Sequence, residues 1–187
     1  MAVLTTADRK TLLILARSAI ASELIDGVRI ERPAEIPATM QELRGCFVTL
    51  HKEGRLRGCI GTIEPTRSLI SNVEENALNA AFRDPRFPAL QADELPMVDI
   101  EISVLSKPEV LPFKNAEDLK SMLKPKIHGV ILSKGWKSAT FLPQVWEQLP
   151  EKEMFLSHLC SKAGMKENDW QYEGITVKVY EAEYFSE

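Results

Sequence analysis

The most chemically informative stretch of the chain is Leu56–Thr62, which places a thiol among glycines and close to an arginine. Cys59 follows Gly58, precedes Gly61 by two residues and lies two residues after Arg57. The thiolate is the nucleophilic form of cysteine, and a neighbouring guanidinium favours it. Glycine within a strand indicates a bulge or a close approach by another backbone or a ligand. The stretch therefore predicts a nucleophile, Cys59, with Arg57, Gly58 and Gly61 as binding residues.

The same stretch also has a purely structural explanation. Cysteine is among the residue types most often buried, and small residues allow a sheet to pack closely against its neighbours. From the residues alone, a buried Cys59, packed against a helix expected to start near Thr66, is the better supported of the two explanations. The accessibility of Cys59 decides between them.

The segment Arg83–Arg86 adds two guanidinium groups and a carboxylate. Guanidinium groups suit carboxylates and phosphates, so Arg83 and Arg86, together with Arg57, predict a local anion-binding site. Asp84 is a candidate general acid or base, and is therefore the second catalytic candidate. Its structural alternative is a turn in which the carboxylate caps the local backbone and pairs with an arginine.

His128 is the remaining binding candidate. It opens an expected strand beside Gly129, at a point where the end of the strand would approach a cleft. A single histidine is more often a packed or surface residue than a base, and spacing does not favour His128 over His51 or His158. We expect no metal site, because the sequence contains neither a CxxC nor an HExxH pattern.

Two strand-forming runs, 46–51 and 56–63, flank a turn centred on Glu53–Gly54. Glycine at this place can take a positive φ, so the pattern predicts a β-hairpin. A symmetric turn places Cys59 opposite Val48, whereas a turn of odd length would reverse the faces of the strand. The residues expected on the face of Cys59 are then Cys46, Leu50 and Arg57.

The remaining pattern alternates helices with strands. Helices are expected over about 6–26, with Thr6 as the N-cap, and over 66–82, 115–123 and 151–163; further strands are expected over 98–104, 128–133, 138–142 and 175–179. Locally paired hairpins with helices between them predict an α+β fold, with an antiparallel or mixed sheet flanked by helices. Because a hairpin followed by a helix recurs, we expect two small lobes that form one compact unit, a single domain over 1–187.

The composition argues against several other classes of protein. The chain has 187 residues, 44% of them hydrophobic and 27% charged, with a formal net charge of −4. This balance disfavours nucleic acid and anionic membranes as partners. No apolar run approaches the length of a membrane span, and the N-terminus lacks the pattern of a signal peptide. Three cysteines without paired spacing argue against a disulfide framework and for a cytoplasmic location.

Several short motifs occur in an order that resembles the AMMECR family, named after the AMME syndrome candidate chromosomal region. They are LRGCIGT at 56–62, DPRFP at 84–88, DEL at 93–95, EISVLS at 101–106, FLPQV at 141–145 and LCSKAG at 159–164. Microbial members of the family include the AmmeMemoRadiSam system protein A type. The resemblance covers roughly 43–185. The chain departs from the family pattern at Cys46 and at 148–150, so no site residue is carried over to the latter segment.

The resemblance implies a two-lobed α+β fold and a cytoplasmic location, without an assigned reaction or cofactor. It also implies that residues 57–61 form the functional site, and that Memo-like and radical SAM proteins share the pathway. Two hypotheses follow. In the first, a cleft lined by Arg57, Cys59, Asp84 and Arg86 binds a small anionic ligand, either as an enzyme or as a binding protein. In the second, the hairpin is the docking edge of a non-catalytic interaction module.

Overall fold

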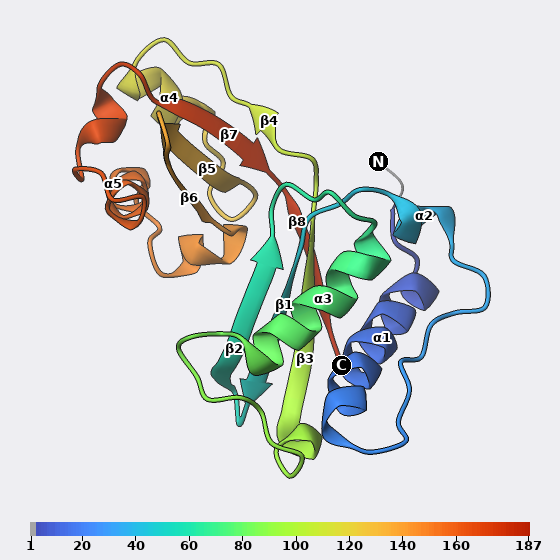
Figure 1. Cartoon of the computed structure of the whole chain (residues 1–187). Coiled ribbons are helices and arrows are strands. Elements are labelled where there is room, and N and C mark those ends of the chain that lie inside the picture. Colours follow the sequence, from blue (N-terminus) through green and yellow to red (C-terminus); the bar gives the residue numbers. More distant parts are fainter. Residues whose placement is uncertain (1–2) are drawn as a thin grey trace. The chain divides into compact units, whose positions relative to one another are not determined.

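The computed structural model describes residues 3–187, which form two units: one contains the chain up to 105 together with 183–187, and the other contains 106–182. Each unit has a four-stranded sheet and its own helices (Figure 1). The strands of both sheets pair in antiparallel fashion. The fold is therefore α+β, as the sequence predicts. Within the described residues, no helix is long and apolar enough to cross a membrane.

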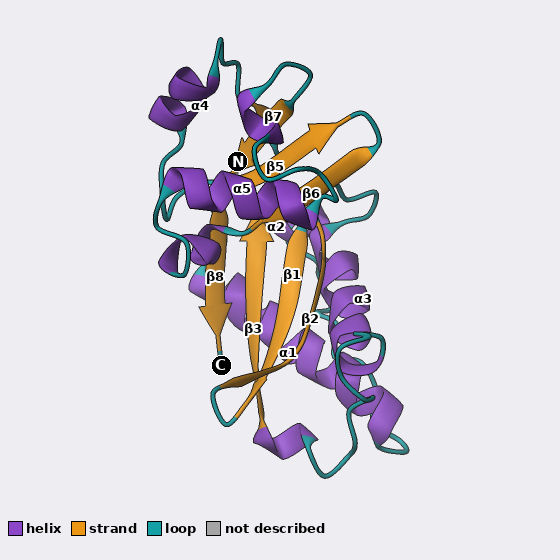
Figure 2. Cartoon of the chain, turned by 90° about the vertical axis from the view of Figure 1, so that its left-hand side faces the viewer, coloured by secondary structure: helices purple, strands orange, loops and turns teal. Residues whose placement is uncertain are grey.

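The first unit positions the LRGCIGT stretch at the edge of a sheet. Its elements are α1 (Thr6–Leu24), α2 (Ala38–Gln41), β1 (Cys46–Lys52), β2 (Arg55–Thr62), α3 (Leu69–Phe82), the 3₁₀ turn η1 (Leu95–Met97), β3 (Val98–Leu105) and β8 (Ala182–Ser186). The strand order is β2-β1-β3-β8, and Figure 2 shows β8 running opposite to β3. Strand β2, which carries the whole LRGCIGT stretch, is thus an edge strand.

The first helix begins at Thr6, as predicted, but its N-cap is one residue earlier than expected and it ends two residues before the predicted end. Thr5, and not Thr6, is its N-cap: the Thr5 hydroxyl accepts a hydrogen bond from the backbone N–H of Asp8, and the Asp8 carboxylate accepts one from the N–H of Thr5. This reciprocal capping box satisfies two backbone donors that the helix itself leaves unpaired. The helix ends at Leu24, three residues before Gly27, which takes a positive φ.

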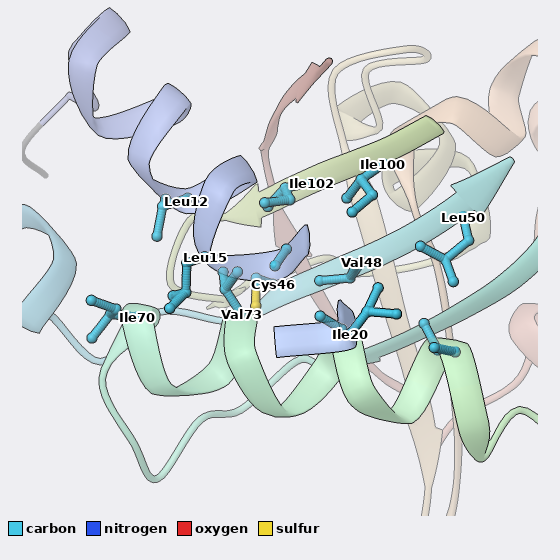
Figure 3. Packing of buried hydrophobic residues seen from close by; sticks show 14 of the residues in the cluster. Leu12, Leu15, Ile20, Cys46, Val48, Leu50, Ile70, Val73, Ile100 and Ile102 are labelled. Carbon is cyan, nitrogen blue, oxygen red and sulfur yellow. The ribbon is translucent and has the colours of Figure 1, made fainter. Parts of the chain in front are cut away.

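Helices α1 and α3 cover one face of the first sheet, and the core lies between them and the strands (Figure 3). The alternate β1 residues Cys46, Val48 and Leu50 are fully buried there, whereas the residues between them are only partly buried. This alternation follows from the two-residue period of a strand, which sends successive side chains to opposite faces. Ile100 and Ile102 of β3 complete the same apolar layer.

The second unit has a separate core. Its elements are β4 (Glu109–Val110), α4 (Ala116–Met122), β5 (Gly129–Lys134), β6 (Lys137–Phe141), η2 (Pro143–Glu147), α5 (Lys152–Lys162), η3 (Asp169–Gln171) and β7 (Thr176–Tyr180), with the strand order β4-β7-β5-β6. The rings of Trp146 and Phe155 stack in this core with centroids 3.6 Å apart. The Trp146 indole N–H donates to the carbonyl of His128 at 2.7 Å, so the buried ring keeps its polar atom paired.

The two units share one order of elements. In each, a helix precedes a β-hairpin, a connecting helix follows it, and a third strand pairs with the first strand of the hairpin. These elements are α1, β1, β2, α3 and β3 in one unit, and α4, β5, β6, α5 and β7 in the other. The fourth strands are exchanged, because the chain leaves β3 for β4 in the second sheet and leaves β7 for β8 in the first. This repeated topology underlies the recurrence that the sequence displays.

Candidate functional site

A bulge in the β1–β2 hairpin reverses the predicted orientation of Cys59. The turn is the expected one, since Lys52 pairs with Arg55 and both intervening residues take a positive φ. Beyond it the register shifts at Arg57, which is an extra residue on β2. Cys59 therefore pairs with Thr49, and the predicted pairing with Val48 is wrong. An extra residue in one strand sends every later side chain to the opposite face.

The reversal turns Cys59 away from the apolar layer under α3. Its thiol lies on the other face of the sheet, where the Thr49 hydroxyl donates a hydrogen bond to Sγ at 3.3 Å. Cys59 is partly exposed, whereas Cys46 and Cys160 are buried. Burial raises the pKa of the Cys46 thiol to about 12 and also raises the pKa of Cys160. Of the three thiols, Cys59 is thus the one placed for chemistry.

Both glycines beside Cys59 are sites of close approach, as predicted, but the approaching groups belong to the protein. A Cβ at Gly58 would lie 2.2 Å from the backbone carbonyl oxygen of Ala80 in α3. A Cβ at Gly61 would lie 2.2 Å from the ring of Phe47 on the paired strand. Gly58 therefore lets the helix pack on the strand, and Gly61 makes room for an aromatic ring.

Asp84 and Arg86 bind the outward-facing backbone of Cys59. The Asp84 carboxylate accepts the Cys59 N–H at 2.9 Å, and the Arg86 guanidinium donates to the Cys59 carbonyl at 3.1 Å. The two side chains also pair with each other through Nε and Nη2 at 2.9 and 2.6 Å. Hydrogen bonding to Arg86 holds the pKa of the Asp84 carboxyl well below its usual range. Together the pair occupies an edge that would otherwise be open to another strand.

These contacts favour the structural explanation of Asp84 that the sequence left open. Its carboxylate also accepts the backbone N–H of Arg86 at 3.1 Å, which is the local turn contact expected of an aspartate before proline. Asp84 is buried and stays ionised, because four hydrogen-bond donors surround its carboxylate. A carboxylate held in this way positions its neighbours and is poorly suited to exchange protons.

Arg57 is committed to an internal ion pair. Its guanidinium donates to both carboxylate oxygens of Glu94, at 3.1 and 2.8 Å, and to the carbonyl of Pro88 at 3.0 Å. Lys52 contacts the same carboxylate at 2.9 Å. Hydrogen bonds from Arg57 and Lys52 lower the pKa of Glu94 to about 2. Arg57, the extra residue of the bulge, thus anchors the hairpin to the segment before β3. Each of its three guanidinium nitrogens already donates a hydrogen bond within the protein.

The two remaining binding candidates make other contacts. Arg83 is exposed at the end of α3, where Nη1 donates to the Asn79 side chain at 3.2 Å. His128 belongs to the second unit, is nearly buried, and accepts the backbone N–H of Lys124 at Nδ1. Burial lowers the pKa of His128, which favours the neutral ring. The neutral Nδ1 accepts the Lys124 N–H and so stabilises the turn that precedes β5.

Sequence reasoning missed two residues of the site, Thr49 and Glu94. Thr49 would have followed from the correct register; the glycines of the strand indicated a bulge or a close approach, but they did not fix the position of the extra residue at Arg57. Glu94 lies within the DEL motif at 93–95, one of the short motifs that carry the family resemblance, and this position is the sequence signal that could have identified it. Among the residues that the structure describes, no group of three or more His, Cys, Asp or Glu side chains is arranged to hold a metal ion.

Comparison with known proteins gives a consistent picture. The AMMECR1 family model matches residues 13–185. A protein of Methanothermobacter thermautotrophicus is 37% identical over 100% of this chain and 97% of its own length, and one of Methanopyrus kandleri is 38% identical over 98% and 90%. The crystal structure of an uncharacterised protein from Pyrococcus horikoshii superposes with a TM-score of 0.86 at 36% identity, covering 94% of this chain and 89% of that one.

Proposed function

Because the chain belongs to the AMMECR1 family, with the matched region including the whole of the site, we propose that it binds a small anionic molecule beside Cys59. In this proposal Arg86 recognises the anion, and Cys59 is the nucleophile toward an electrophilic carbon of the bound molecule. Arg86 takes the part that the sequence assigned to Arg57, whose donors are engaged by Glu94.

One observation carries the proposal: a partly exposed thiol stands next to a half-exposed guanidinium in a fixed geometry. Arg86 has 54% of its side chain exposed, and its Nη2 binds the carbonyl of the residue that carries the thiol. The Thr49 hydroxyl contacts Sγ on the face of the sheet opposite α3. A nucleophile on the strand, with a cation bound to the backbone of the same residue, meets the geometric demand of positioning a charged reactant.

The reaction class is nucleophilic substitution at carbon. Sγ forms a bond to the electrophilic carbon, the leaving group departs with the bonding electron pair, and the thiol proton passes to solvent. The role of Arg86 is to hold an acidic group of the reactant, since guanidinium binds carboxylate and phosphate oxygens strongly. Thr49 is a positioning residue, because it contacts the sulfur and not the reactant.

Alkylation with two reagents of the same reactivity type tests the proposal. Iodoacetate is anionic and iodoacetamide is neutral, and both replace iodide with the cysteine sulfur. We expect the iodoacetate-to-iodoacetamide rate ratio of Cys59 to exceed that of a free cysteine derivative severalfold. Mass spectrometry assigns the label, and the buried thiols Cys46 and Cys160 serve as internal controls for unfolding.

Matched variants isolate the contribution of Arg86. Arg86→Gln should return the ratio to that of the free thiol, Arg86→Lys should retain part of it, and Arg83→Gln, three residues away on the same surface turn, should leave it unchanged. A ratio equal to that of the free thiol in the wild-type protein would remove anion recognition from the proposal. An unreactive Cys59 toward both reagents would remove the nucleophile.

A second candidate function is docking of a protein partner at the β2 edge, with Memo-like and radical SAM proteins as the partners in the cytoplasm. It is favoured by Gly61, whose backbone has no hydrogen-bond partner among the described residues. At Cys59, by contrast, Asp84 and Arg86 already occupy the edge. Co-purification with such a partner, lost on Arg86→Gln and retained on Arg83→Gln, would support docking.

A further inference from the structure

The edge of β2 continues beyond the position that Asp84 and Arg86 occupy. Along an antiparallel strand, successive residues alternate in where their backbone N–H and C=O point: toward the paired strand at one residue, and away from it at the next. The backbone N–H and C=O of Cys59 point away from β1, because they bind Asp84 and Arg86. Gly61 lies two residues further along the strand, opposite Phe47, so its N–H and C=O point out of the same edge.

No hydrogen bond reaches the N–H of Gly61 from any residue in 3–187. Gly61 is only partly buried, so this outward-pointing N–H on an edge strand is available to solvent or to an acceptor from another molecule. Because residue 61 is a glycine, it has no side chain that could shield its own backbone N–H. An unpaired donor at a partly buried edge is a place where an acceptor from outside the chain is expected.

The groups along this edge have an alternating order that indicates which acceptor fits. The Cys59 N–H is met by a carboxylate, and the Cys59 carbonyl by a guanidinium. The Gly61 N–H comes next along the edge. A carboxylate that accepts the Gly61 N–H could also accept a hydrogen bond from the Arg86 guanidinium, on the side of that group that Asp84 does not contact.

Arg86 has the donor capacity that this arrangement needs. Its Nε and Nη2 are used by Asp84 and by the Cys59 carbonyl. Its Nη1 makes no hydrogen bond within the described part of the chain, and more than half of the side chain is exposed. One guanidinium N–H together with the N–H of the residue two positions after Cys59 would supply donors for the two oxygens of a carboxylate.

We propose that the Gly61 N–H and the Arg86 guanidinium form a carboxylate-binding subsite at the edge of β2. The inference rests on the proposed function and names the acidic group of its ligand. A carboxylate fits better than a phosphate, because Asp84 already compensates the charge of Arg86 and a dianion would find one backbone donor. The carboxylate comes either from a small organic acid or from the C-terminus of a peptide that extends along β2.

Backbone amide NMR tests the subsite directly. Replacing Gly61 is not informative, since a Cβ would collide with the Phe47 ring. Instead, ¹⁵N-labelled protein is titrated with sodium acetate, with sodium chloride and with inorganic phosphate at equal ionic strength. We expect acetate to move the Gly61 amide proton downfield in a saturable manner, because the amide gains an acceptor, and expect chloride to leave it unmoved. Arg86→Gln should weaken the response about tenfold, and Arg83→Gln should not.

The source of the carboxylate is resolved by a second pair of probes. A short acetylated peptide with a free C-terminus is compared with the same peptide bearing a C-terminal amide. Tighter binding of the free-acid peptide than of acetate, with further shifts along β2, assigns the subsite to a chain end. If the free-acid peptide binds no more tightly than acetate does, the subsite is assigned to a small organic acid.

The outcomes separate this inference from the proposed function. If the Gly61 amide does not respond while the iodoacetate preference of Cys59 persists, the subsite is overturned and anion recognition by Arg86 stands. If both fail, neither holds. If phosphate moves the amide at lower concentration than acetate does, the carboxylate assignment is overturned.

Discussion

The two hairpins cap their outer strands in the same way. Counted from the turn, the fourth pair is Cys59 with Thr49 in the first unit and Thr140 with Ile131 in the second. The outward carbonyl of each outer-strand residue is bound by a cation that comes from the segment after the hairpin. Arg86 binds the Cys59 carbonyl at 3.1 Å, and Lys162 binds the Thr140 carbonyl at 3.0 Å. An edge strand needs such protection against pairing with other chains.

The hairpins differ in regularity, and the irregular one contains the candidate site. The β5–β6 register runs without interruption, and the Thr140 hydroxyl is used inside the protein by Tyr180 and Val130. The β1–β2 hairpin contains the bulge at Arg57, which turns the Cys59 thiol onto the face of the sheet opposite α3. The common topology supplies a rigid frame, and the local irregularity supplies the site. Bulges near active sites re-aim side chains in this manner.

Of the changes that distinguish the two hairpins, loss of the Arg57–Glu94 ion pair at the bulge should lower the free energy of unfolding most. Arg57→Met leaves the Glu94 carboxylate, with 16% of its side chain exposed, without its bidentate partner. We expect the free energy of unfolding to fall by about 3 kcal/mol. Lys134→Met, which removes a 3.6 Å contact to Asp169 in the second unit, should cost less than about 1 kcal/mol. Urea unfolding measures both, and equal losses would show that the pair does not hold the bulge.

Substitution of the glycine under α3 should have the next largest effect. Gly58→Ala places a Cβ 2.2 Å from the backbone of Ala80, and backbone cannot move aside as a side chain can. We expect a loss of about 2 kcal/mol of stability from overpacking. In the second hairpin, Gly135→Ala meets no neighbouring atom but is strained by its positive φ, and should cost about 1 kcal/mol. A smaller loss at 58 than at 135 would contradict the close packing inferred for α3.

Acid should weaken the first unit through Glu94. The folded pKa of about 2 lies below the ordinary value of 4.5, so the unfolded chain binds the proton more readily than the folded one. The stabilisation is complete above pH 4.5 and is lost as the pH falls toward 2. We expect the free energy of unfolding to decline over this window, and to decline less steeply in Glu94→Gln. An identical pH dependence in the variant would contradict the assignment.

The smallest effect should come from the threonine beside the thiol. Thr49→Val removes the hydroxyl that holds Sγ, and we expect the alkylation rate of Cys59 to change by roughly two- to tenfold, the range of one hydrogen bond. The iodoacetate-to-iodoacetamide ratio should stay constant, because Arg86 is untouched. Thr140→Val in the other hairpin should leave the rate unaltered. An unchanged rate in Thr49→Val would exclude Thr49 as a positioning residue.

Much of the fold follows from local pattern in the sequence. The alternation of Val98, Ile100 and Ile102 with polar residues predicted β3, and the glycine at 54 predicted the hairpin turn, because strand period and positive φ depend on near neighbours alone. The site was less predictable. Arg57 and Arg86 are equivalent candidates in the sequence, yet one is consumed by an ion pair and the other is half exposed.

The sequence by itself determined the helices, the strands, the α+β class and a distinctive thiol-bearing stretch, since these rest on contacts between residues close in the chain. Tertiary structure decided what that stretch presents. The bulge at Arg57 is anchored by Glu94, 37 positions later, and the backbone of Cys59 is held by Asp84, 25 positions later. Such long-range hydrogen bonds select one register from several that local propensity permits. The exposure of Cys59 is thus a property of the fold.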